Sequence, residues 1–491
     1  MAVLKDIAYK VSLKSVKGDM NREVSGICID SRDVESGALF AAIRGTKTDG
    51  HDFIDAAIDK GATSIVCEEM PNQPRSEVTY LVVDSAAKAL GQVAANFYGN
   101  PSDKLHLIAI TGTNGKTTTA TLLFQLFRDL GYGVGLLSTV NNRINDRVIP
   151  AALTTPDAVS MNRLLSSMVA EGCTHCFIEA SSHAIVQERI AGLQITGAVF
   201  TNLSHDHLDY HGSFENYIKA KKKLFDELPK NAFALVNVDD KRGQIMLQNT
   251  SADKVTYGVK RLADYKAKIV SNTIKGLELE IDQHTVWFRL IGEFNAYNII
   301  AAYAVAMLLG ESSEEVLRQL SSKGPAPGRF DRVNTSTKVT AIVDYAHTPD
   351  ALNKVLTAIR SFRTGQEQVI TVVGCGGDRD KDKRPVMAEI ACKYSDRVIL
   401  TSDNPRDENP DQILMDMKKG INAAHQKKVL SIVDRKEAIK TACTLSDNHD
   451  IILVAGKGHE TYQEIKGTRH EFDDKVIIAE MMELVKGGNE D

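Results

Sequence analysis

The sequence contains no run of about twenty apolar residues, the length that a helix needs to cross a bilayer. Its first residues, MAVLKDIAYKVSLKSVKGDM, also lack the long apolar core of a signal peptide. No internal repeat or low-complexity tract occurs along the 491 residues. These absences predict no membrane insertion, and we expect a folded protein in the cytoplasm.

Excess positive charge and paired cysteines are missing as well. The net charge is −5, which gives no reason to expect nucleic acid as a partner. The seven cysteines are an odd number and stand mostly in apolar runs, which favours buried thiols over a disulfide framework. Cys173 and Cys176 form a single CxxC pattern, but without a second pair buried thiols are favoured over zinc or redox chemistry.

Turn-rich segments divide the chain into three domains. At 491 residues the chain is too long for one core and suggests about three. Short apolar strands alternate with helical patterns throughout, which predicts α/β folds separated at NPSD and at KGPAPGRFDRV. We predict a small α/β domain at residues 1–100, a central P-loop ATPase-like domain with a parallel sheet at 101–326, and a doubly wound, Rossmann-like domain at 327–491.

The most specific pattern is the strand LHLIAI with the loop TGTNGKTT, at residues 105–118. Backbone N–H groups near Gly112 and Gly115 can point at phosphate oxygens. Lys116 supplies a positive charge, and Thr117 offers a hydroxyl to Mg²⁺. Apolar residues then recur with helical spacing, so the loop joins a strand to a helix. The pattern predicts a site for a nucleoside triphosphate.

One position departs from the usual phosphate-loop pattern. That pattern carries glycine five positions before Gly115, where this sequence has Ile110. The alternative is an ordinary turn whose glycines satisfy only backbone geometry. The helix predicted over residues 117–130, with Gly131 as its C-terminal cap, favours phosphate binding.

Polar residues also follow two later strands of the central domain. Glu179 lies near the end of CTHCFIEA and Asn202 near the end of AVFTNL, and ligands of open α/β sheets collect beyond such strand ends. The segment NLSHDHLDYHG then crowds aspartates with histidines such as His207 and His211, which suits a divalent metal with at most two of the histidines as ligands. The lysine run at residues 219–223 indicates an exposed helix face.

The third domain contains a loop that resembles a dinucleotide fingerprint. In GCGGDR the third glycine position is occupied by Arg379, so we expect no nicotinamide cofactor. The cations of this region suit carboxylates or phosphates instead. They are Arg379, Lys381, Lys383, Arg384 and Arg406. A solvated polar loop is the alternative, and it is favoured for Lys381 and Lys383.

The motifs of the chain, taken together, are similar to those of one family. In order they are TGTNGKTT, TTPD, EASSH, NLSHDHLDYHG, YIKAKKKLF, GEFNAYN, PGRFDRV, DYAHTPDAL, GCGGDRDKDKRP, DNPR and GKGHETYQ. This series resembles the Mur ligase family over essentially the whole chain from ICIDSR onward. The family loop has the form GTNGKT, which accounts for Ile110.

The resemblance implies an enzyme that forms an amide bond. It implies an ATP-dependent, ADP-forming ligase that adds meso-diaminopimelate to UDP-N-acetylmuramoyl-L-alanyl-D-glutamate through an acyl phosphate. Such an enzyme acts in peptidoglycan precursor synthesis, and thereby in cell wall biogenesis, cell shape, cell cycle and cell division. The implied cofactor is Mg²⁺, with ATP as a substrate. We expect a cytoplasmic monomer.

Five residues match the catalytic and metal positions of the family. Lys116 would hold the β- and γ-phosphates, while Thr117 and Glu179 match ligands of Mg²⁺. His207 would assist at a second Mg²⁺. Lys221 matches a lysine that is carbamylated and so becomes a metal ligand.

The resemblance also implies binding positions for three ligands. The nucleotide positions are Gly112, Thr113, Asn114, Gly115, Lys116, Thr117, Thr118, Asn295, Arg329 and Asp344. The muramoyl-peptide positions are Thr154, Thr155, Ser181, Gln187 and Arg189, with Ser31 as a contact to the uridine nucleotide. The diaminopimelate positions are Arg379, Asp403, Asn404, Pro405, Arg406, Gly456 and Glu460. Helix capping is an alternative role for Ser181 and for Asn295.

The motif DNPR carries the expected amino-acid specificity. In the family this form goes with meso-diaminopimelate, and enzymes that add lysine usually have a small residue at the position of Arg406. A bidentate guanidinium–carboxylate pair would account for that choice, because diaminopimelate has a distal carboxylate and lysine has none. Glu460 suits the substrate ammonium.

Other hypotheses stay open at this point. The same reaction with L-lysine is the nearest. Folylpolyglutamate synthetase shares the ATP domain but would not carry this N-terminal domain or DNPR, and MurF lacks this arrangement of GDRDKDKRP with DNPR. From another class, a P-loop ATPase switch would hydrolyse ATP to drive motion without forming a bond. The hinge PGRFDR predicts that the third domain closes on its substrates.

Overall fold

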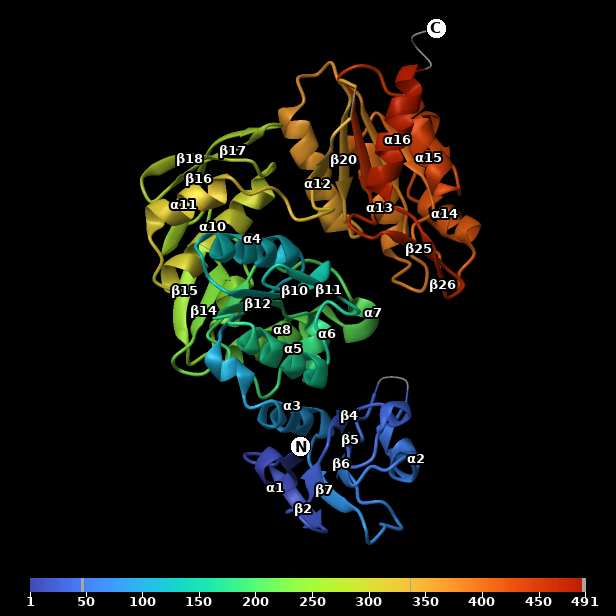
Figure 1. Cartoon of the computed structure of the whole chain (residues 1–491). Coiled ribbons are helices and arrows are strands. Elements are labelled where there is room, and N and C mark those ends of the chain that lie inside the picture. The colour runs from blue at the N-terminus through green and yellow to red at the C-terminus, as the bar shows by residue number, and fades with distance from the viewer. Residues whose placement is uncertain (46–47, 336, 488–491) are drawn as a thin grey trace.

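The computed structural model describes residues 1–45, 48–335 and 337–487. Three α/β domains follow one another along this part of the chain, with the central domain between the other two (Figure 1). The fold class predicted from the alternation of strands and helices is confirmed. In the described residues no helix is both long and apolar enough to cross a membrane.

The N-terminal domain is built on a mostly parallel sheet. Its strand order is β2-β7-β6-β5-β4, and β2 is the antiparallel edge. Ser85 is the N-cap of α3, because its hydroxyl accepts a hydrogen bond from the Lys88 N–H at 3.3 Å. The elements are β1 Ala2–Val3, α1 Leu4–Ile7, β2 Leu13–Lys17, β3 Glu23–Val24, β4 Ile27–Cys28, β5 Leu39–Ala41, α2 Ile54–Asp59, β6 Ser64–Cys67, β7 Thr79–Val83 and α3 Ala86–Phe97.

The C-terminal domain has helices on both faces of its sheet. The strand order is β19-β20-β24-β21-β22-β23, parallel except for β19. Side chains of α12, α13 and α14 pack on one face, and those of α15 and α16 pack on the other, as in a doubly wound fold. The elements are β19 Asp331–Val333, β20 Thr340–Asp344, α12 Pro349–Phe362, β21 Val369–Val373, α13 Lys383–Tyr394, β22 Arg397–Leu400, α14 Pro410–Lys418, β23 Val429–Ser431, α15 Arg435–Thr444, β24 Ile451–Ala455, β25 Tyr462–Ile465, β26 Thr468–Glu471 and α16 Asp474–Gly487.

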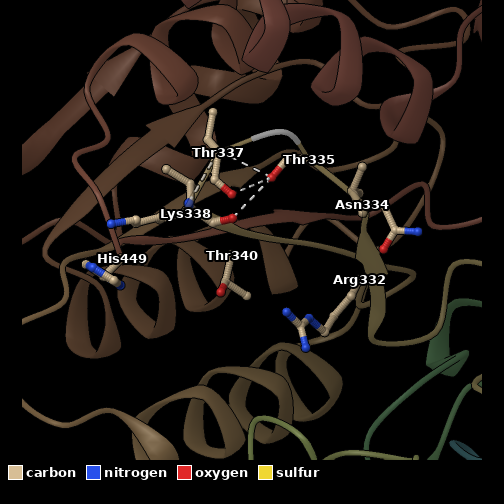
Figure 2. Close-up of a pocket in the computed structure, with 9 residues that line it drawn as sticks. Arg332, Asn334, Thr335, Thr337, Lys338, Thr340 and His449 are labelled. Carbon is tan, nitrogen blue, oxygen red and sulfur yellow. Dashed lines mark hydrogen bonds between the residues drawn. The ribbon is translucent and has the colours of Figure 1, made fainter. Parts of the chain in front are cut away.

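A cavity of about 410 Å³ lies beside β19 in this domain (Figure 2). Thr340 at the start of β20 and His449 before β24 both line it, so it lies at the amino ends of parallel strands. Ligands of open α/β sheets collect at the opposite, carboxyl ends. The hydroxyl of Thr335 already bonds within the lining, to the Val339 carbonyl at 3.3 Å. The cavity is therefore separate from the predicted site.

The central domain contains the longest sheet. Its order is β11-β10-β9-β12-β8-β13-β14-β15-β16-β17-β18, with parallel pairing from β9 to β16 and antiparallel hairpins at both edges. The elements are β8 His106–Thr111, α4 Lys116–Asp129, β9 Val134–Leu137, β10 Asn141–Ile144, β11 Arg147–Pro150, α5 Ala158–Ala170, β12 His175–Glu179, α6 Ser182–Val186, β13 Gly197–Phe200, α7 Leu208–His211, α8 Phe214–Asp226, β14 Phe233–Asn237, α9 Gly243–Met246, β15 Asp253–Gly258, β16 Tyr265–Thr273, β17 Gly276–Ile281, β18 His284–Phe288, α10 Glu293–Leu308 and α11 Ser313–Ser321.

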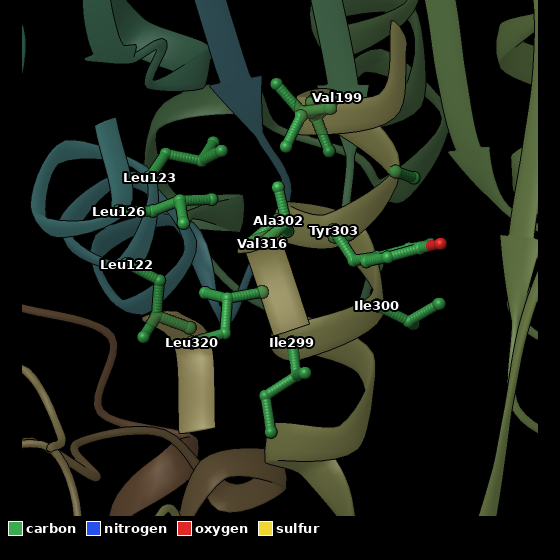
Figure 3. Packing of buried hydrophobic residues seen from close by; sticks show 14 of the residues in the cluster. Leu122, Leu123, Leu126, Val199, Ile299, Ile300, Ala302, Tyr303, Val316 and Leu320 are labelled. Carbon is green, nitrogen blue, oxygen red and sulfur yellow. The ribbon is translucent and has the colours of Figure 1, made fainter. Parts of the chain in front are cut away.

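Strand β8 is buried on both faces, which explains its continuous apolar sequence. Ile108 and Ile110 belong to one core cluster, with α4, α10 and α11, while Leu107 and Ala109 belong to the other. Figure 3 shows the first cluster, in which leucines of α4 lie near apolar residues of α10 and α11. Helix α10 is buried on nearly all sides, so it holds α4 from behind. The helix that follows the phosphate loop thus has a fixed position.

A buried ion pair joins two helices of the C-terminal domain. Arg435 opens α15 and Asp474 opens α16, and both side chains are fully buried. The Arg435 guanidinium donates to the two Asp474 carboxylate oxygens at 2.8 and 2.7 Å. It also donates to the Ser402 and Ala455 carbonyls, at 3.3 and 3.0 Å. The pair therefore ties α16 to the ends of β22 and β24.

Replacing one partner should destabilise the fold. Asp474→Asn leaves the Arg435 charge buried without a counter-charge, and we expect a loss of about 3–5 kcal/mol in the free energy of unfolding. Denaturant unfolding of wild type and variant measures it. The matched control is Glu437→Gln, which removes the exposed pair with Lys440 and should cost under about 1 kcal/mol. Equal effects of the two variants would contradict the prediction.

A buried histidine lies at the end of the central sheet away from the phosphate loop. The His175 ring packs 4.7 Å from Phe127, 4.6 Å from Tyr132 and 4.9 Å from His106, measured between ring centres. Burial disfavours its charged form and lowers the pKa of His175 from 6.5 to about 4, and the nearby His106 acts in the same direction.

This histidine should make the stability of the protein depend on pH. Between pH 6.5 and pH 4 the unfolded chain takes up a proton at His175 that the folded protein does not, so the free energy of unfolding falls as the pH falls. His175→Phe keeps an aromatic ring and should make that fall shallower. Denaturant unfolding at several pH values tests it, with values above pH 6.5 as the baseline. Parallel pH profiles for the two proteins would refute it.

Candidate functional site

Two glycines shape the loop between β8 and α4. Gly112 has φ 150° and Gly115 has φ 91°. A Cβ at Gly112 would lie 1.9 Å from the Thr201 hydroxyl, and one at Gly115 would lie 2.6 Å from the Asn298 side-chain oxygen. A larger residue would therefore displace the loop from its supports.

The loop is held by residues that follow β13. The N–H of Thr113 donates to the Asn202 carbonyl at 2.8 Å, and the N–H of Asn114 donates to the Asn202 side chain at 3.1 Å. The Asn114 carbonyl accepts from Thr201 and Asn202, at 2.7 and 2.9 Å. Asn202 was identified from its position at a strand end, and its role is to fix the loop.

Lys116 and Thr117 occupy the first turn of α4. The Lys116 ammonium donates to the carbonyls of Gly112 and Thr113, each at 2.9 Å. Burial lowers the pKa of Lys116, while Glu179 acts in the opposite direction. The Thr117 hydroxyl donates to a carboxylate oxygen of Glu179 at 3.0 Å. The predicted cation and the predicted metal ligands therefore come together.

Glu179 ends β12 beside the loop, because β12 pairs with β8. Its side chain is buried, and Thr139 donates to both carboxylate oxygens, from the N–H at 2.8 Å and from the hydroxyl at 3.1 Å. Sequence reasoning missed Thr139. The available signal was a hydroxyl residue just after β9, at the same carboxyl edge as Glu179.

The C-terminal domain also contributes to this site. Arg329 lies before β19, and its guanidinium donates to the Thr117 hydroxyl at 3.1 Å while covering the Tyr345 ring at 4.5 Å. On the other side of the loop, the Asn114 side chain donates to the Asp350 carboxylate at 2.8 Å. Tyr345 and Asp350 carried no functional prediction, because their contacts join segments far apart in the sequence.

These groups enclose a cavity of about 150 Å³. Its walls come from the central and C-terminal domains, and they are mostly polar. The lining residues are Thr113, Asn114, Gly115, Lys116, Thr117, Thr118, Thr139, Thr154, Glu179, Ser181, Asp206, His207, Arg329, Tyr345 and His347. Eleven of the predicted site residues and Thr139 therefore face one space.

The histidine-rich segment is only partly at the cavity. His207 faces it with φ 54°, and its ring nitrogen lies 3.4 Å from the Asp206 carboxylate. Burial lowers the pKa of His207 to about 4 despite that carboxylate, so its imidazole is neutral near pH 7 and able to bind a metal. His211 is buried instead and lies 2.9 Å from the Ser182 hydroxyl.

The lysine run on α8 is not simply an exposed face. Lys219 is exposed and Lys222 and Lys223 are half-buried, and for Lys221 that interpretation was wrong. Lys221 is buried, with only 1% of the residue exposed. Its ammonium donates to the Gly112 carbonyl at 2.9 Å and lies 4.7 Å from the centre of the Tyr217 ring. Burial holds the pKa of Lys221 well below its ordinary value. This lysine therefore reaches the phosphate loop from behind.

The residues matched to the muramoyl peptide form a connected group beside Glu179. Thr155 donates to the Glu179 carbonyl at 2.6 Å and accepts from the Ser181 N–H at 3.1 Å. Arg189 donates to the Thr155 carbonyl at 2.8 Å and to the side-chain oxygen of Gln187. Thr154 lies 3.2 Å from the Thr139 hydroxyl.

Two more residues matched to the muramoyl substrate are Ser181, which caps a helix, and Ser31, which lies in another domain. Ser181 begins α6, since its hydroxyl accepts from the Ala184 N–H at 3.2 Å, so its predicted capping role is confirmed. Ser31 lies in the N-terminal domain, in the short 3₁₀ helix Ser31–Asp33.

Asn295 and Asp344 lie behind the cavity. Helix α10 begins after Gly292, so the N-cap alternative for Asn295 was wrong; its side chain donates to the Ile291 carbonyl at 2.8 Å and accepts from Asn298. Asp344 accepts from the Phe330 N–H at 2.6 Å. Burial raises the pKa of Asp344 to about 6, although Arg329 opposes the shift.

A second polar group lies at the carboxyl ends of β22 and β24. A Cβ at Gly456 would lie 2.3 Å from the Asp403 carboxylate, so glycine is needed there. The Asn404 amide donates to the Glu460 carboxylate at 2.8 Å. Arg406 has φ 51°, and its guanidinium donates to the Gly377 carbonyl at 2.8 Å.

A glycine in the loop after β21 leaves room for two of the predicted cations. Both Arg406 and the exposed Arg379 lie near Gly376, where an added Cβ would be 2.9 Å from the Arg406 guanidinium and 3.8 Å from the Arg379 side chain. Lys383, which was favoured as solvated, donates to the His347 carbonyl at 3.0 Å.

Arg384 does not serve as a ligand-binding cation, and that part of the prediction was wrong. Its side chain is fully buried and pairs with Glu408 at 2.8 Å and Asp416 at 3.0 Å. Because its two terminal nitrogens each donate to a carboxylate, Arg384 fixes α13 against α14 and the segment before it.

The oxygen groups of the cavity fit Mg²⁺. Thr117 and Glu179 supply a hydroxyl and a carboxylate, the kind of ligand that Mg²⁺ takes from proteins, and Mg²⁺ completes its shell with water and phosphate oxygens. Within the described residues no group of three or more His, Cys, Asp or Glu side chains is arranged to hold a metal. That finding is compatible with an ion bound by few protein ligands.

Comparisons with known proteins cover nearly the whole chain. Residues 23–98 match "Mur ligase family, catalytic domain", residues 110–306 match "Mur ligase middle domain", and residues 328–458 match "Mur ligase, glutamate ligase domain". These three matches fall, in order, on the N-terminal, central and C-terminal domains of the structure.

Full-length relatives agree with these matches. A UDP-N-acetylmuramoyl-L-alanyl-D-glutamate--2,6-diaminopimelate ligase from Cytophaga hutchinsonii is 59% identical over 483 residues, 98% of this chain and 99% of the relative. A ligase of the same name from Bacteroides thetaiotaomicron is 53% identical over 479 residues, with 98% and 99% covered. A solved structure of an enzyme of that name is 34% identical, with a TM-score of 0.69 over 98% of this chain and 99% of the other. From its motifs, its fold and these likenesses, the chain belongs to the Mur ligase family.

Proposed function

We propose that the protein joins the amino group of meso-diaminopimelate to the side-chain carboxylate of UDP-N-acetylmuramoyl-L-alanyl-D-glutamate, with ATP converted to ADP and phosphate. As a member of the Mur ligase family the chain is an ATP-dependent ligase. The single observation that carries the proposal is the cavity where the Lys116 loop, Glu179 and Arg329 meet. The names of the full-length relatives support the choice of substrates.

The chemistry of amide formation explains why these groups must converge. A carboxylate is a poor electrophile, so it first attacks the γ-phosphate of ATP to give an acyl phosphate and ADP. The amine then attacks the acyl carbon, loses a proton and displaces phosphate. Each step concentrates negative charge on oxygen, and cationic and N–H groups fixed in advance stabilise that charge.

The residues of the phosphate loop would bind the nucleotide. In this proposal the loop from Gly112 to Thr118 and the Lys116 ammonium hold the β- and γ-phosphates. The N–H groups of Thr113 and Asn114 are taken by Asn202, so those at the start of α4, from Lys116 to Thr118, are the ones that would face the phosphates. Arg329 adds a second positive charge from the C-terminal domain. Asn295 and Asp344 complete the nucleotide site from behind, consistent with their burial.

Thr117 and Glu179 would hold Mg²⁺, with His207 and Lys221 near a second ion. Bound Mg²⁺ neutralises phosphate charge and lets oxygen nucleophiles approach phosphorus. The protein groups align the reactants: Thr139 fixes the Glu179 carboxylate, and Asp206 lies beside the His207 ring.

Lys221 is proposed to act as a carbamate. Its buried ammonium has a carbonyl and an aromatic ring as neighbours, a poor setting for a positive charge. Attack of its neutral amine on carbon dioxide forms an N–C bond, releases a proton and gives a carboxylate.

Isotope-labelled bicarbonate tests this proposal. We expect one labelled carbamate signal in the wild-type protein, lost in Lys221→Met and retained in Lys219→Met, whose lysine is exposed on the same helix. A wild-type protein without such a signal would contradict the carbamate.

The muramoyl peptide is proposed to bind at the wall of the cavity beside Glu179. Thr154, Thr155 and Ser181 lie beside Glu179, where the muramoyl peptide is proposed to bind, with Gln187 and Arg189 behind them. Ser31 would contact the uridine nucleotide from the N-terminal domain.

The amino acid is proposed to bind at the ends of β22 and β24. The residues are Arg379, Asp403, Asn404, Pro405, Arg406, Gly456 and Glu460. Arg406 would pair with the distal carboxylate of diaminopimelate, and Glu460 would receive an ammonium.

The proposed cellular role of the protein follows from this reaction. We propose that the protein works as a cytoplasmic monomer in peptidoglycan precursor synthesis, and so contributes to cell wall biogenesis, cell shape and cell division. The domain limits proposed for it are 1–100 for the uridine nucleotide, 101–326 for ATP and 327–491 for the amino acid.

The first experiment measures phosphate release from ATP together with product mass. Turnover is expected only when UDP-N-acetylmuramoyl-L-alanyl-D-glutamate and meso-diaminopimelate are both present. Turnover with L-lysine in place of diaminopimelate would keep the ligase and overturn the amino-acid choice. ATP turnover that ignores both co-substrates would favour the ATPase switch.

Arg406→Asn tests the amino-acid choice directly. Asparagine tolerates the positive φ of this position, so the backbone can stay in place. Loss of the guanidinium should raise the KM for diaminopimelate about tenfold or more and leave the KM for ATP unchanged. An unchanged KM for diaminopimelate would show that Arg406 does not read its distal carboxylate.

A further inference from the structure

Lys457 is a fully buried lysine that the proposed reaction does not yet use. It follows Gly456 directly after β24, and none of its side chain is exposed. Its ammonium donates to the Asn404 side-chain oxygen at 3.0 Å and to the Glu460 carboxylate at 3.2 Å. Lysine is almost never fully buried unless its charge is paired, so these contacts account for its position.

The ammonium sets the orientation of the Asn404 amide. A lysine ammonium can only donate hydrogen bonds, so the amide must turn its oxygen toward Lys457. The Glu464 N–H donates to the same oxygen at 3.0 Å. The amide nitrogen is thereby directed at Glu460, to which it donates at 2.8 Å. Without the ammonium the Asn404 amide would lose one of its two fixed donors.

The same ammonium balances the charge of the pocket. Glu460 is buried beside Asp403, and both its burial and that neighbour raise the pKa of Glu460, while Lys457 and Asn404 lower it. The other charged or titratable groups near Glu460 are Arg435 from α15, Tyr345 after β20 and Tyr462 of β25. Arg435 is already paired with Asp474, which leaves Lys457 as the ammonium in contact with Glu460.

We propose that Lys457 is a positioning residue of the amino-acid pocket, holding Asn404 and Glu460 in the arrangement that receives the ammonium of an incoming zwitterionic amino acid. The inference rests on the proposed function. Lys457 acts through its two neighbours and does not itself attract the substrate amine, which has the same charge. Its removal should therefore weaken binding of the amino acid and of no other substrate.

The experiment compares steady-state kinetics of Lys457→Met with wild type for each of the three substrates. The KM for meso-diaminopimelate should rise about tenfold or more, the effect of losing a charge-assisted hydrogen bond, with the KM values for ATP and the muramoyl substrate unchanged. Lys457→Gln, which can donate a hydrogen bond but carries no charge, is the second variant should methionine impair folding.

A double-variant cycle separates positioning from general destabilisation. If Lys457 acts through Glu460, the variant with both Lys457→Met and Glu460→Gln should have nearly the same KM for diaminopimelate as Glu460→Gln alone. The matched control is Lys428→Met, because Lys428 also bonds to carbonyls of this domain, those of Cys392 and Ser395, outside the pocket.

Each outcome bears on one claim. One outcome is a wild-type enzyme that is active with diaminopimelate and a Lys457→Met variant whose KM for it is unchanged. That result would overturn the role of Lys457 and leave the proposed ligase activity intact. Parallel losses for all substrates, or effects equal to those of Lys428→Met, would show a structural role only. A wild-type protein that forms no product would overturn the proposed function itself.

Discussion

The hydrogen-bonded carboxylate of Glu179 is the constraint on which the site depends. It accepts hydrogen bonds from Thr117, in the first turn of α4 after β8, and from Thr139, in the segment after β9. Its side chain thus connects the carboxyl ends of three neighbouring strands, β8, β12 and β9. A buried carboxylate without these donors would pay a large desolvation cost. Because the apolar strands beneath it pack on both faces, the backbone cannot easily move to relieve a lost contact. The position of the phosphate loop is therefore set by the packed apolar strands of the central sheet and by the Glu179 carboxylate at their carboxyl ends.

Much of the fold could be predicted from local patterns. The helix expected over residues 117–130 is observed as α4 Lys116–Asp129, and the strand series of the C-terminal domain forms the expected parallel sheet. These elements are specified by nearby residues: apolar spacing, glycines with positive φ, and hydroxyl caps such as Ser85 and Ser181. Strand ends were informative for the same reason, because parallel strands place their carboxyl ends at one edge. Glu179 and Asn202 were identified in this way.

What could not be predicted lies in contacts between distant segments. Lys221 and Arg384 look like exposed cations in the sequence, yet both are buried, one against the Gly112 carbonyl and the other between two carboxylates. Charge patterning describes helix faces but does not show what packs against them. Asn295 was expected as a possible cap because asparagine favours that role, whereas the helix starts three residues earlier. The resemblance to a family assigns Lys221 to the metal site, and the structure shows its ammonium buried against the phosphate loop, an unusual position for a lysine.

The hydrogen bond between Arg329 and Thr117 connects the C-terminal domain directly to the first turn of the helix that follows the phosphate loop. The Thr117 hydroxyl oxygen accepts a hydrogen bond from the Arg329 guanidinium, which lies just before β19 of the C-terminal domain. A cation that took this same oxygen as a ligand would lie beside that guanidinium, and the two positive charges would repel. Binding of such a cation at Thr117 and formation of the Arg329–Thr117 contact are then thermodynamically linked, and each changes the equilibrium of the other by the same free energy. A single threonine oxygen is thus shared between the phosphate loop and the contact that joins the central and C-terminal domains.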